Sequence, residues 1–361
     1  MTTPINKEDL VIHILNVGFG DNIVIEFPVD DSDKRSYAIV DCYDADKTKD
    51  YLNKLFRMSP HQSNLAFICA THPHSDHISG IESLLLDSTF CPKEFWDSGF
   101  RHKSLTYRKI LDALIDKNID MIRVSSGMER YFGKVRVTVL SPSVVLRNKY
   151  DTYGIDMNNA SVVLRLEHHD DEVLSMRSQE YEADKSLEAI RTAGKSVVIL
   201  AGDAEFDSWA QISNEYPKLD RTSENDPLVK KMINYLACEV IKVAHHGSMH
   251  SSPLDIYEKM RPKLAVISAE QKISSKSIEG RTLKRGLFPH HSATIALEEC
   301  DARIITTDGS YESEKGEDGN PRDASLSHSG SIVIVVPPGG KPRYMKLSDK
   351  KDEVPDPPNA I

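Results

Sequence analysis

Apolar positions along this chain follow two periods, one typical of strands and one typical of helices. Residues 10–28 and 35–42 alternate apolar and polar side chains around a Gly-Phe-Gly-Asp turn, which predicts three successive antiparallel strands. Residues 44–58 and 103–118 carry apolar side chains at helical spacing. The first third of the chain therefore indicates a mixed α/β protein.

The second half repeats this alternation without an exact sequence period. We expect further strands within 159–168, 194–203, 239–247, 262–268, 302–308 and 330–338, with helices between several of them. No linker divides the chain, so residues 8–340 are predicted to form a single domain. Polar, charge-mixed segments near 170–195, 213–228 and 311–330 are predicted to be surface insertions, and 345–361 a disordered tail.

Composition narrows the class of protein. The chain has 361 residues and a formal net charge of -10, the wrong sign for a surface that simply coats nucleic acid. Its apolar runs fall far short of the ~20 residues that span a bilayer, and no signal segment opens the chain, so we expect a cytoplasmic protein with no membrane contact. Five cysteines without a CxxC pair indicate reduced thiols.

Candidate chemistry concentrates in the stretch THPHSDHISG, residues 71–80, between a predicted strand at 65–70 and a predicted helix at 77–87. We expect Ser75 or Asp76 to cap that helix. Four of six consecutive positions carry groups that bind metal ions, namely His72, His74, Asp76 and His77. Imidazoles and carboxylates suit zinc and similar divalent ions, so the stretch predicts a metal site.

The pattern T-H-x-H-x-D-H-x-x-G resembles the signature of the metallo-β-lactamase superfamily. The resemblance implies a four-layer αββα sandwich that holds one or two divalent ions, zinc or manganese, at one edge. It assigns Asp41 to orienting the site, Asp203 to bridging two ions and His245 to the last histidine ligand. All three residues follow apolar runs that predict strands.

One position departs from the superfamily pattern. Most binuclear members have another histidine near residues 153–161, and this chain has none there. The site built on His72, His74 and Asp203 would thus lack one protein ligand, with Asn158, Asn159 or water in its place. The other site would be complete, with Asp76, His77, Asp203 and His245. The later histidines of the chain at 168 and 169 are expected at the surface.

The motifs together resemble the hydrolase domain of ComEC-type competence proteins, which bring DNA into bacteria. They include LNVGFGDNIVIEF, MNNASVVLRLE, VVILAGDAE and IKVAHHGSMHSS; Phe19 stands where that subfamily usually has glutamine, and the membrane channel is absent. The resemblance adds a late histidine near a proline, matched here by His290 or His291, as a proton donor to the leaving group. His246 and Ser248 are candidates to contact substrate.

These residues predict metal-assisted hydrolysis. A divalent ion lowers the pKa of bound water from about 15.7 to about 7 and yields hydroxide at neutral pH. Asp76 would be both a ligand and the acceptor of the water proton. The leading hypothesis is a phosphodiesterase or nuclease acting on nucleic acid or a nucleotide. The alternatives are a hydrolase of a small ester, lactone or thioester, and a non-catalytic metal-binding module. The sequence does not identify protein partners.

Overall fold

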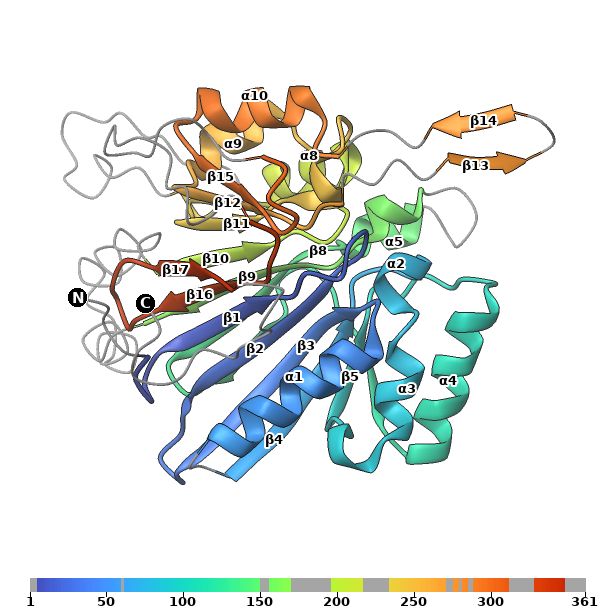
Figure 1. Ribbon diagram of the computed structural model, residues 1–361, viewed down its shortest axis with the longest axis vertical. Coiled ribbons are helices and arrows are strands. Elements are labelled where there is room, and N and C mark those ends of the chain that lie inside the picture. The colour runs from blue at the N-terminus through green and yellow to red at the C-terminus, as the bar shows by residue number, and fades with distance from the viewer. Residues whose placement is uncertain are drawn as a thin grey trace.

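The structure is a computed structural model. It describes residues 5–59, 62–149, 156–169, 196–216, 234–270, 275–278, 281–284, 288–311 and 328–347. Labels of helices and strands follow Figure 1. Most of each expected insertion, and nearly all of the expected tail, lie outside the described residues, so those expectations and the single-domain boundary stay predictions.

The first sheet contains most of the N-terminal half of the chain and the last two strands. Its order is β17-β16-β1-β2-β3-β4-β5-β6, antiparallel from β17 to β3 and parallel from β3 to β6. The strands are β1 (Leu10–Ile14), β2 (Asn22–Val29), β3 (Lys34–Cys42), β4 (Gln62–Ala70), β5 (Glu94–Asp97), β6 (Asp120–Arg123), β16 (Ile332–Val336) and β17 (Arg343–Lys346).

The second sheet has the order β15-β12-β11-β10-β9-β8-β7, with β10, β11, β12 and β15 parallel. Its strands are β7 (Glu129–Phe132), β8 (Val135–Ser141), β9 (Val163–His168), β10 (Val197–Leu200), β11 (Val240–Lys242), β12 (Leu264–Ile267) and β15 (Arg303–Thr306). A separate two-stranded ribbon, β13 (Ser275–Ile278) and β14 (Arg281–Lys284), projects from the body in Figure 1.

Helices cover the outer face of each sheet, as Figure 1 shows. Apolar residues of α1, α3 and α4 pack on the first sheet, and those of α8, α9 and α10 on the second. The helices are α1 (Ala45–Met58), α2 (Ser75–Ile78), α3 (Ile81–Leu86), α4 (Leu105–Lys117), α5 (Val144–Lys149), α8 (Phe206–Glu215), α9 (Leu254–Met260) and α10 (His291–Glu299); η1 (Ser88–Phe90), η2 (Met157–Ala160) and η3 (Ala244–Gly247) are 3₁₀ turns.

The two sheets pack face to face around a shared apolar core. Their inner faces contribute buried side chains that include Ile12, Phe67, Leu164 and Val266. With helices outside both sheets, this arrangement is a four-layer αββα sandwich. The fold class expected from the sequence is therefore confirmed.

Most of the predicted strands and helices are present, with two differences near the site. The helix expected over 77–87 is two short helices, α2 and α3, separated at Ser79 and Gly80. The strand expected from residue 159 begins at Val163, because the residues before it form η2. None of the helices in the described part of the chain is long and apolar enough to cross a membrane.

Candidate metal centre

The strand order brings the chemically active loops to one edge of the sandwich. Asp41 lies near the end of β3, residues 71–77 follow β4, Asp203 follows β10, and the 245–246 pair follows β11. Each of these strands runs parallel to a neighbour in its sheet. Since the carboxyl ends of parallel strands meet at the same edge, the loops from both sheets face each other there.

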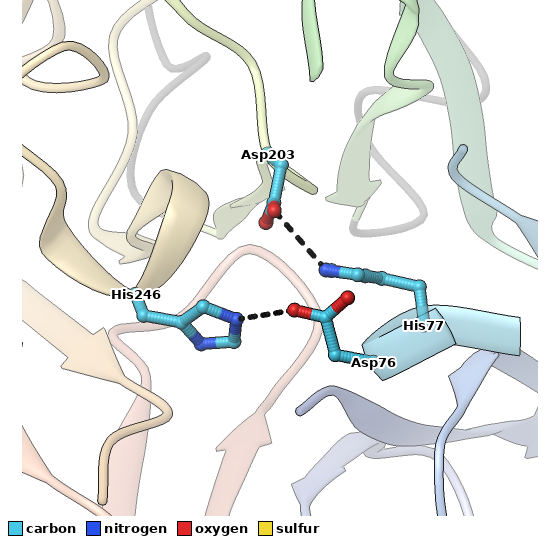
Figure 2. A group of neighbouring side chains, drawn as sticks. All are labelled: Asp76, His77, Asp203 and His246. Atoms are coloured by element: carbon cyan, nitrogen blue, oxygen red, sulfur yellow. Dashed lines mark ion pairs between the residues drawn. The ribbon is translucent and has the colours of Figure 1, made fainter. Parts of the chain in front are cut away.

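Four side chains from these loops form a compact cluster, drawn in Figure 2. The ligand atoms of Asp76, His77, Asp203 and His246 all lie within 4.8 Å of one another. His77 Nε2 is 3.2 Å from Asp203 Oδ2, and His246 Nε2 is 3.8 Å from Asp76 Oδ2. Three of the four residues are fully buried, and Asp76 keeps 22% of its side chain exposed. Two carboxylates and two imidazoles therefore converge from both sheets.

Atoms at the centre of this cluster have no hydrogen-bond partner. They are His77 Nε2, His246 Nε2 and Asp203 Oδ1, and all three are buried. Buried polar atoms are normally paired, because an unpaired one costs about 1–3 kcal/mol. Two imidazole nitrogens and carboxylate oxygens pointing at one place fit the ligand set of a divalent metal ion. The residues present thus fit such an ion.

Both histidines are oriented through their other ring nitrogen. His77 Nδ1 lies 2.7 Å from Asp41 Oδ2, while Thr71 donates to both carboxylate oxygens of Asp41 from its backbone N (2.7 Å) and its hydroxyl (2.6 Å). His246 Nδ1 lies 3.0 Å from the backbone oxygen of Ser268. A partner on Nδ1 places the proton there and leaves Nε2 as the ligand atom. The contact with His77 is where an orienting carboxylate would act, and that role of Asp41 stays a prediction.

The charges of the cluster balance one another. Burial opposes a charge on His77, but Asp203 and Asp41 outweigh it and raise the pKa of His77 well above its usual value. Burial would likewise raise the pKa of Asp203, yet the charge of His77 brings it well below its usual value. The carboxylates thus hold positive charge between them, as they would when ligating a cation.

The remaining histidines of the 71–80 stretch, His72 and His74, also lie beside Asp203. His72 Nε2 is 3.7 Å from Asp203 Oδ2 and 3.0 Å from His74 Nδ1. Burial, and then the charge of His77, lower the pKa of His72 well below its usual value. A neutral imidazole is the form that binds a metal. His72 and His74 are therefore available for a second ion beside Asp203.

The structure places the adjacent residues His245 and His246 differently from the sequence expectation. His246, expected to contact substrate, belongs to the cluster with Asp76 and His77, where His245 was expected. His245 Nε2 instead lies 3.8 Å from Asp203 Oδ2, and its Nδ1 lies 2.9 Å from Glu205 Oε1. Both histidines have left-handed backbone, with φ of 47° and 53°. This turn sends the two rings in different directions, which a strand-end pattern alone does not indicate.

A buried ion pair beside the cluster was not anticipated from the sequence. Asp21, in the Gly-Phe-Gly-Asp turn, accepts a hydrogen bond from Lys242 of β11, and both side chains are fully buried. Asp21 Oδ2 also lies 3.9 Å from His77 Nδ1. A lysine inside an otherwise apolar strand (VIKV) is the sequence signal that could have indicated this pair.

The other polar residues proposed from the sequence, two asparagines and a serine, have different contacts in the structure. Asn158 Nδ2 lies 3.1 Å from Glu205 Oε1, and Asn158 Oδ1 is buried without a hydrogen-bond partner. Asn159 Oδ1 accepts from the backbone N of Ser208 in α8, so its amide supports that helix. Ser248 is buried, and its hydroxyl accepts from the backbone N of His250. Of the two asparagines, Asn158 is thus the one that contacts residues beside the candidate metal centre.

The late histidines lie at the start of α10. His290 is the N-cap, with its Nδ1 accepting from the backbone N of Ser292, and both His290 and His291 are exposed. The backbone N of His290 donates to Gly247 O at 2.8 Å, which ties this helix to the loop of His246. Their predicted role as proton donors stays a prediction.

Two expectations from the sequence were wrong. His168 and His169, expected at the surface, are buried. The His168 side chain lies against β16 of the other sheet, with Nδ1 2.8 Å from Val336 O, and His169 Nε2 lies 3.5 Å from the buried Glu167 carboxylate. Ser75 and Asp76, expected as helix caps, both lie inside α2, whose N-cap is His74 without a side-chain hydrogen bond. The carboxylate of Asp76 points to His246 instead, as Figure 2 shows.

Comparisons with known proteins agree with the sequence resemblance. No protein-family model matches the chain. ComE operon protein 3 of Bacillus subtilis is 24% identical over 242 residues, 66% of this chain and 23% of that protein, so the chain spans less than a quarter of that relative's length. This match confirms the resemblance to the ComEC-type hydrolase domain.

Solved structures with a similar fold were also found. They include the metallo-β-lactamase fold protein YhfI from Bacillus subtilis (TM-score 0.40, 12% identity, 82% of this chain and 96% of that one). Unliganded yeast PDE1 has a TM-score of 0.40 and 12% identity over 85% of this chain and 98% of that one. A diphosphatase from the PhnP family has a TM-score of 0.35 and 11% identity over 77% and 99% of the two chains.

Proposed function

We propose that this protein is a metal-dependent phosphodiesterase or nuclease. The observation that carries the proposal is the convergence of Asp76, His77, Asp203 and His246, whose ligand atoms lie within 4.8 Å of one another. A divalent ion bound there supplies a Lewis acid that activates water and stabilises negative charge developing on a phosphoryl group. Zinc and manganese both suit this ligand set.

The exposure of the site indicates where substrate enters. Most of the ligand side chains are buried, whereas Asp76 and His245 keep 22% and 21% of their side chains exposed. Burial would raise the pKa of Asp76, but the His246 and His77 imidazoles lower it well below its usual value. Asp76 is therefore ionised at neutral pH, at the open side of the cluster, and accepts the proton of the attacking water. His290 or His291, both exposed, protonates the leaving oxygen.

Aromatic side chains beside the cluster favour a substrate that carries a nucleobase. Phe19 and Phe288 are half-buried, and their ring centroids lie 5.6 Å apart. Phe19 also packs against His246, with centroids 4.5 Å apart. Stacking of a base on an aromatic ring contributes about 1–3 kcal/mol and tolerates any base. Together with the ComEC-type resemblance, these rings support a nucleotidyl phosphodiester over a small ester.

Cleavage of end-labelled linear DNA, single- and double-stranded, with manganese or zinc tests the proposal. We expect the wild type to cut, and Asp203→Ala to lose at least about 100-fold in rate because it removes a carboxylate at the centre of the site. Asp116→Ala, at an exposed position of α4, is the matched control and should cut like the wild type.

A chromogenic carboxylic ester and a chromogenic bis-phosphodiester are assayed alongside. Turnover of the ester without turnover of either phosphodiester substrate would overturn the proposal and favour a small-ester hydrolase. A wild type that retains metal and cleaves none of these substrates would equally contradict it and favour a non-catalytic metal-binding module.

A further inference from the structure

His245 lies where a second metal position needs a ligand. The sequence leaves that position one histidine short, with His72, His74 and Asp203 as its protein ligands. We propose that His245 supplies the missing histidine, so that the adjacent residues His245 and His246 bind two different ions. The inference rests on the proposed metal dependence and deepens it, because it gives the protein two complete metal positions.

Distances around Asp203 support this assignment. Asp203 Oδ2 lies 3.7 Å from His72 Nε2 and 3.8 Å from His245 Nε2. The same oxygen is 3.2 Å from the Nε2 atom of His77, which belongs to the cluster with Asp76 and His246. One carboxylate thus faces imidazoles of both groups. His74 Nδ1 lies 3.0 Å from His72 Nε2, so three imidazoles are gathered near the Asp203 carboxylate, and both kinds of group are ligands that suit zinc.

Glu205 gives His245 the orientation of a ligand. Glu205 Oε1 lies 2.9 Å from His245 Nδ1, which places the proton on Nδ1 and leaves Nε2 directed at Asp203. Asp41 acts on His77 in the same way. Such carboxylate–histidine pairs are typical of metal ligands. Glu205 is therefore a positioning residue whose sequence position, two after Asp203, was not singled out by any motif.

Asn158 connects this pair to the place where the histidine is missing. Its Nδ2 lies 3.1 Å from Glu205 Oε1, and Asn158 is largely buried. The segment that carries a histidine in most binuclear relatives here carries an asparagine that fixes Glu205. Asn158 Nδ2 also lies 3.4 Å from His245 Nδ1, so this asparagine helps to hold the Glu205–His245 pair in place.

The backbone explains how neighbouring residues serve separate ions. His245 and His246 have φ of 47° and 53°, and Gly247 continues the left-handed run with φ of 76°. Left-handed residues other than glycine are uncommon, and they concentrate at functional sites. In this turn the two ring centroids lie 6.2 Å apart with planes at 68°. The His245 ring faces Asp203 and Glu205, and the His246 ring faces Asp76.

Metal content without any substrate tests the inference. Metal-free protein is loaded with zinc, dialysed and analysed by elemental mass spectrometry, and Co²⁺ loading is followed by its visible absorption. We expect two ions per chain in the wild type and about one in His245→Ala. Glu205→Gln should lower the affinity for one of the two ions by about 10–100-fold. His250→Ala, at an exposed histidine of the same loop, is the matched control and should keep two.

Double variants assign the ligands to their ions. His72→Ala with His245→Ala should still bind about one ion, because both changes affect the same position. His245→Ala with His246→Ala should bind almost none, because each removes a ligand of a different ion. Circular dichroism confirms that each variant is folded before its metal content is read.

Three results would overturn the inference. They are a wild type that holds one ion, a His245→Ala protein that holds two with unchanged affinity, and a His245→Ala, His246→Ala protein that still holds one. A wild type that holds two ions but cleaves no phosphodiester would sink the proposed function and leave this inference standing. The two proposals are thus separated by their measurements.

Discussion

Lys242 is a charged side chain in the middle of a buried strand, and its position depends on one partner. It donates to Asp21, and the pair is fully enclosed. Burial alone would raise the pKa of Asp21, but the charge of Lys242 lowers it below its usual value. Removing one member leaves the other as an uncompensated buried charge, which costs about 3–5 kcal/mol. We expect Lys242→Met to lower the free energy of unfolding by that amount in urea denaturation.

The double variant Asp21→Asn with Lys242→Met separates loss of the ion pair from loss of packing. Replacing both charges leaves no unpaired ion, so most of the lost stability should return. A double variant as unstable as Lys242→Met would mean that the pair matters through shape rather than charge.

Sequence reasoning located individual residues where a motif is local. Four candidate ligands follow β4 within the 71–80 stretch, in a loop and the short helix α2. Asp41 lies near the end of β3 and Asp203 follows β10. The resemblance to the metallo-β-lactamase signature, together with these strand-end positions, predicted that they converge. The sequence did not indicate Glu205, and it predicted that His246 contacts substrate. Both positions depend on a left-handed turn and on contacts between loops. The spacing of apolar residues along the sequence does not predict such a turn.

The two short helices that follow β4 are held apart by a close approach at Gly80. A Cβ placed on Gly80 would lie 2.7 Å from Cys42 Sγ and 2.8 Å from the backbone N of Ala45. We therefore expect Gly80→Ala to destabilise the protein by about 1–3 kcal/mol, although alanine favours helices. Because α2 carries Asp76 and His77, zinc affinity should fall as well. Urea denaturation and a competing chelating dye measure the two effects.

Ser83→Ala, on the exposed side of α3, is the matched control for Gly80→Ala. It adds no atoms against a neighbour, so its stability should stay within about 0.5 kcal/mol of the wild type. A Gly80→Ala protein as stable as this control would contradict the prediction, because it would mean that β3 and α1 move enough to accommodate the extra methyl group.

Helices and strands were predicted well where the apolar pattern is long and uniform. The spans of α1 and α4 and the three N-terminal strands agree closely with the sequence expectation. The break between α2 and α3 was not predicted, because leucine and isoleucine continue at helical spacing across Gly80. Contact with β3, distant in sequence, decides that break.

The sandwich as a whole is joined at one end by a histidine between its two sheets. His168 of β9 donates from Nδ1 to Val336 O of β16, at 2.8 Å. Burial lowers the pKa of His168 to about 4. The hydrogen bond to the Val336 carbonyl partly opposes this shift, and the charges of His169 and Lys134 add weakly to it. The folded protein thus keeps this imidazole neutral at pH values where the unfolded chain protonates it.

This difference predicts a stability that depends on pH. The unfolded chain binds the proton near pH 6.5 and the folded protein near pH 4, so stability contributed above pH 6.5 is lost as the pH falls towards 4 and declines no further below it. The loss amounts to about 3 kcal/mol. His168→Asn keeps a donor for Val336 without a titrating ring, so its urea midpoint should fall less between pH 6.5 and 4 than that of the wild type. The same substitution at the exposed His250 controls for the loss of one imidazole, and equal slopes for both variants would show that the link between the sheets does not titrate.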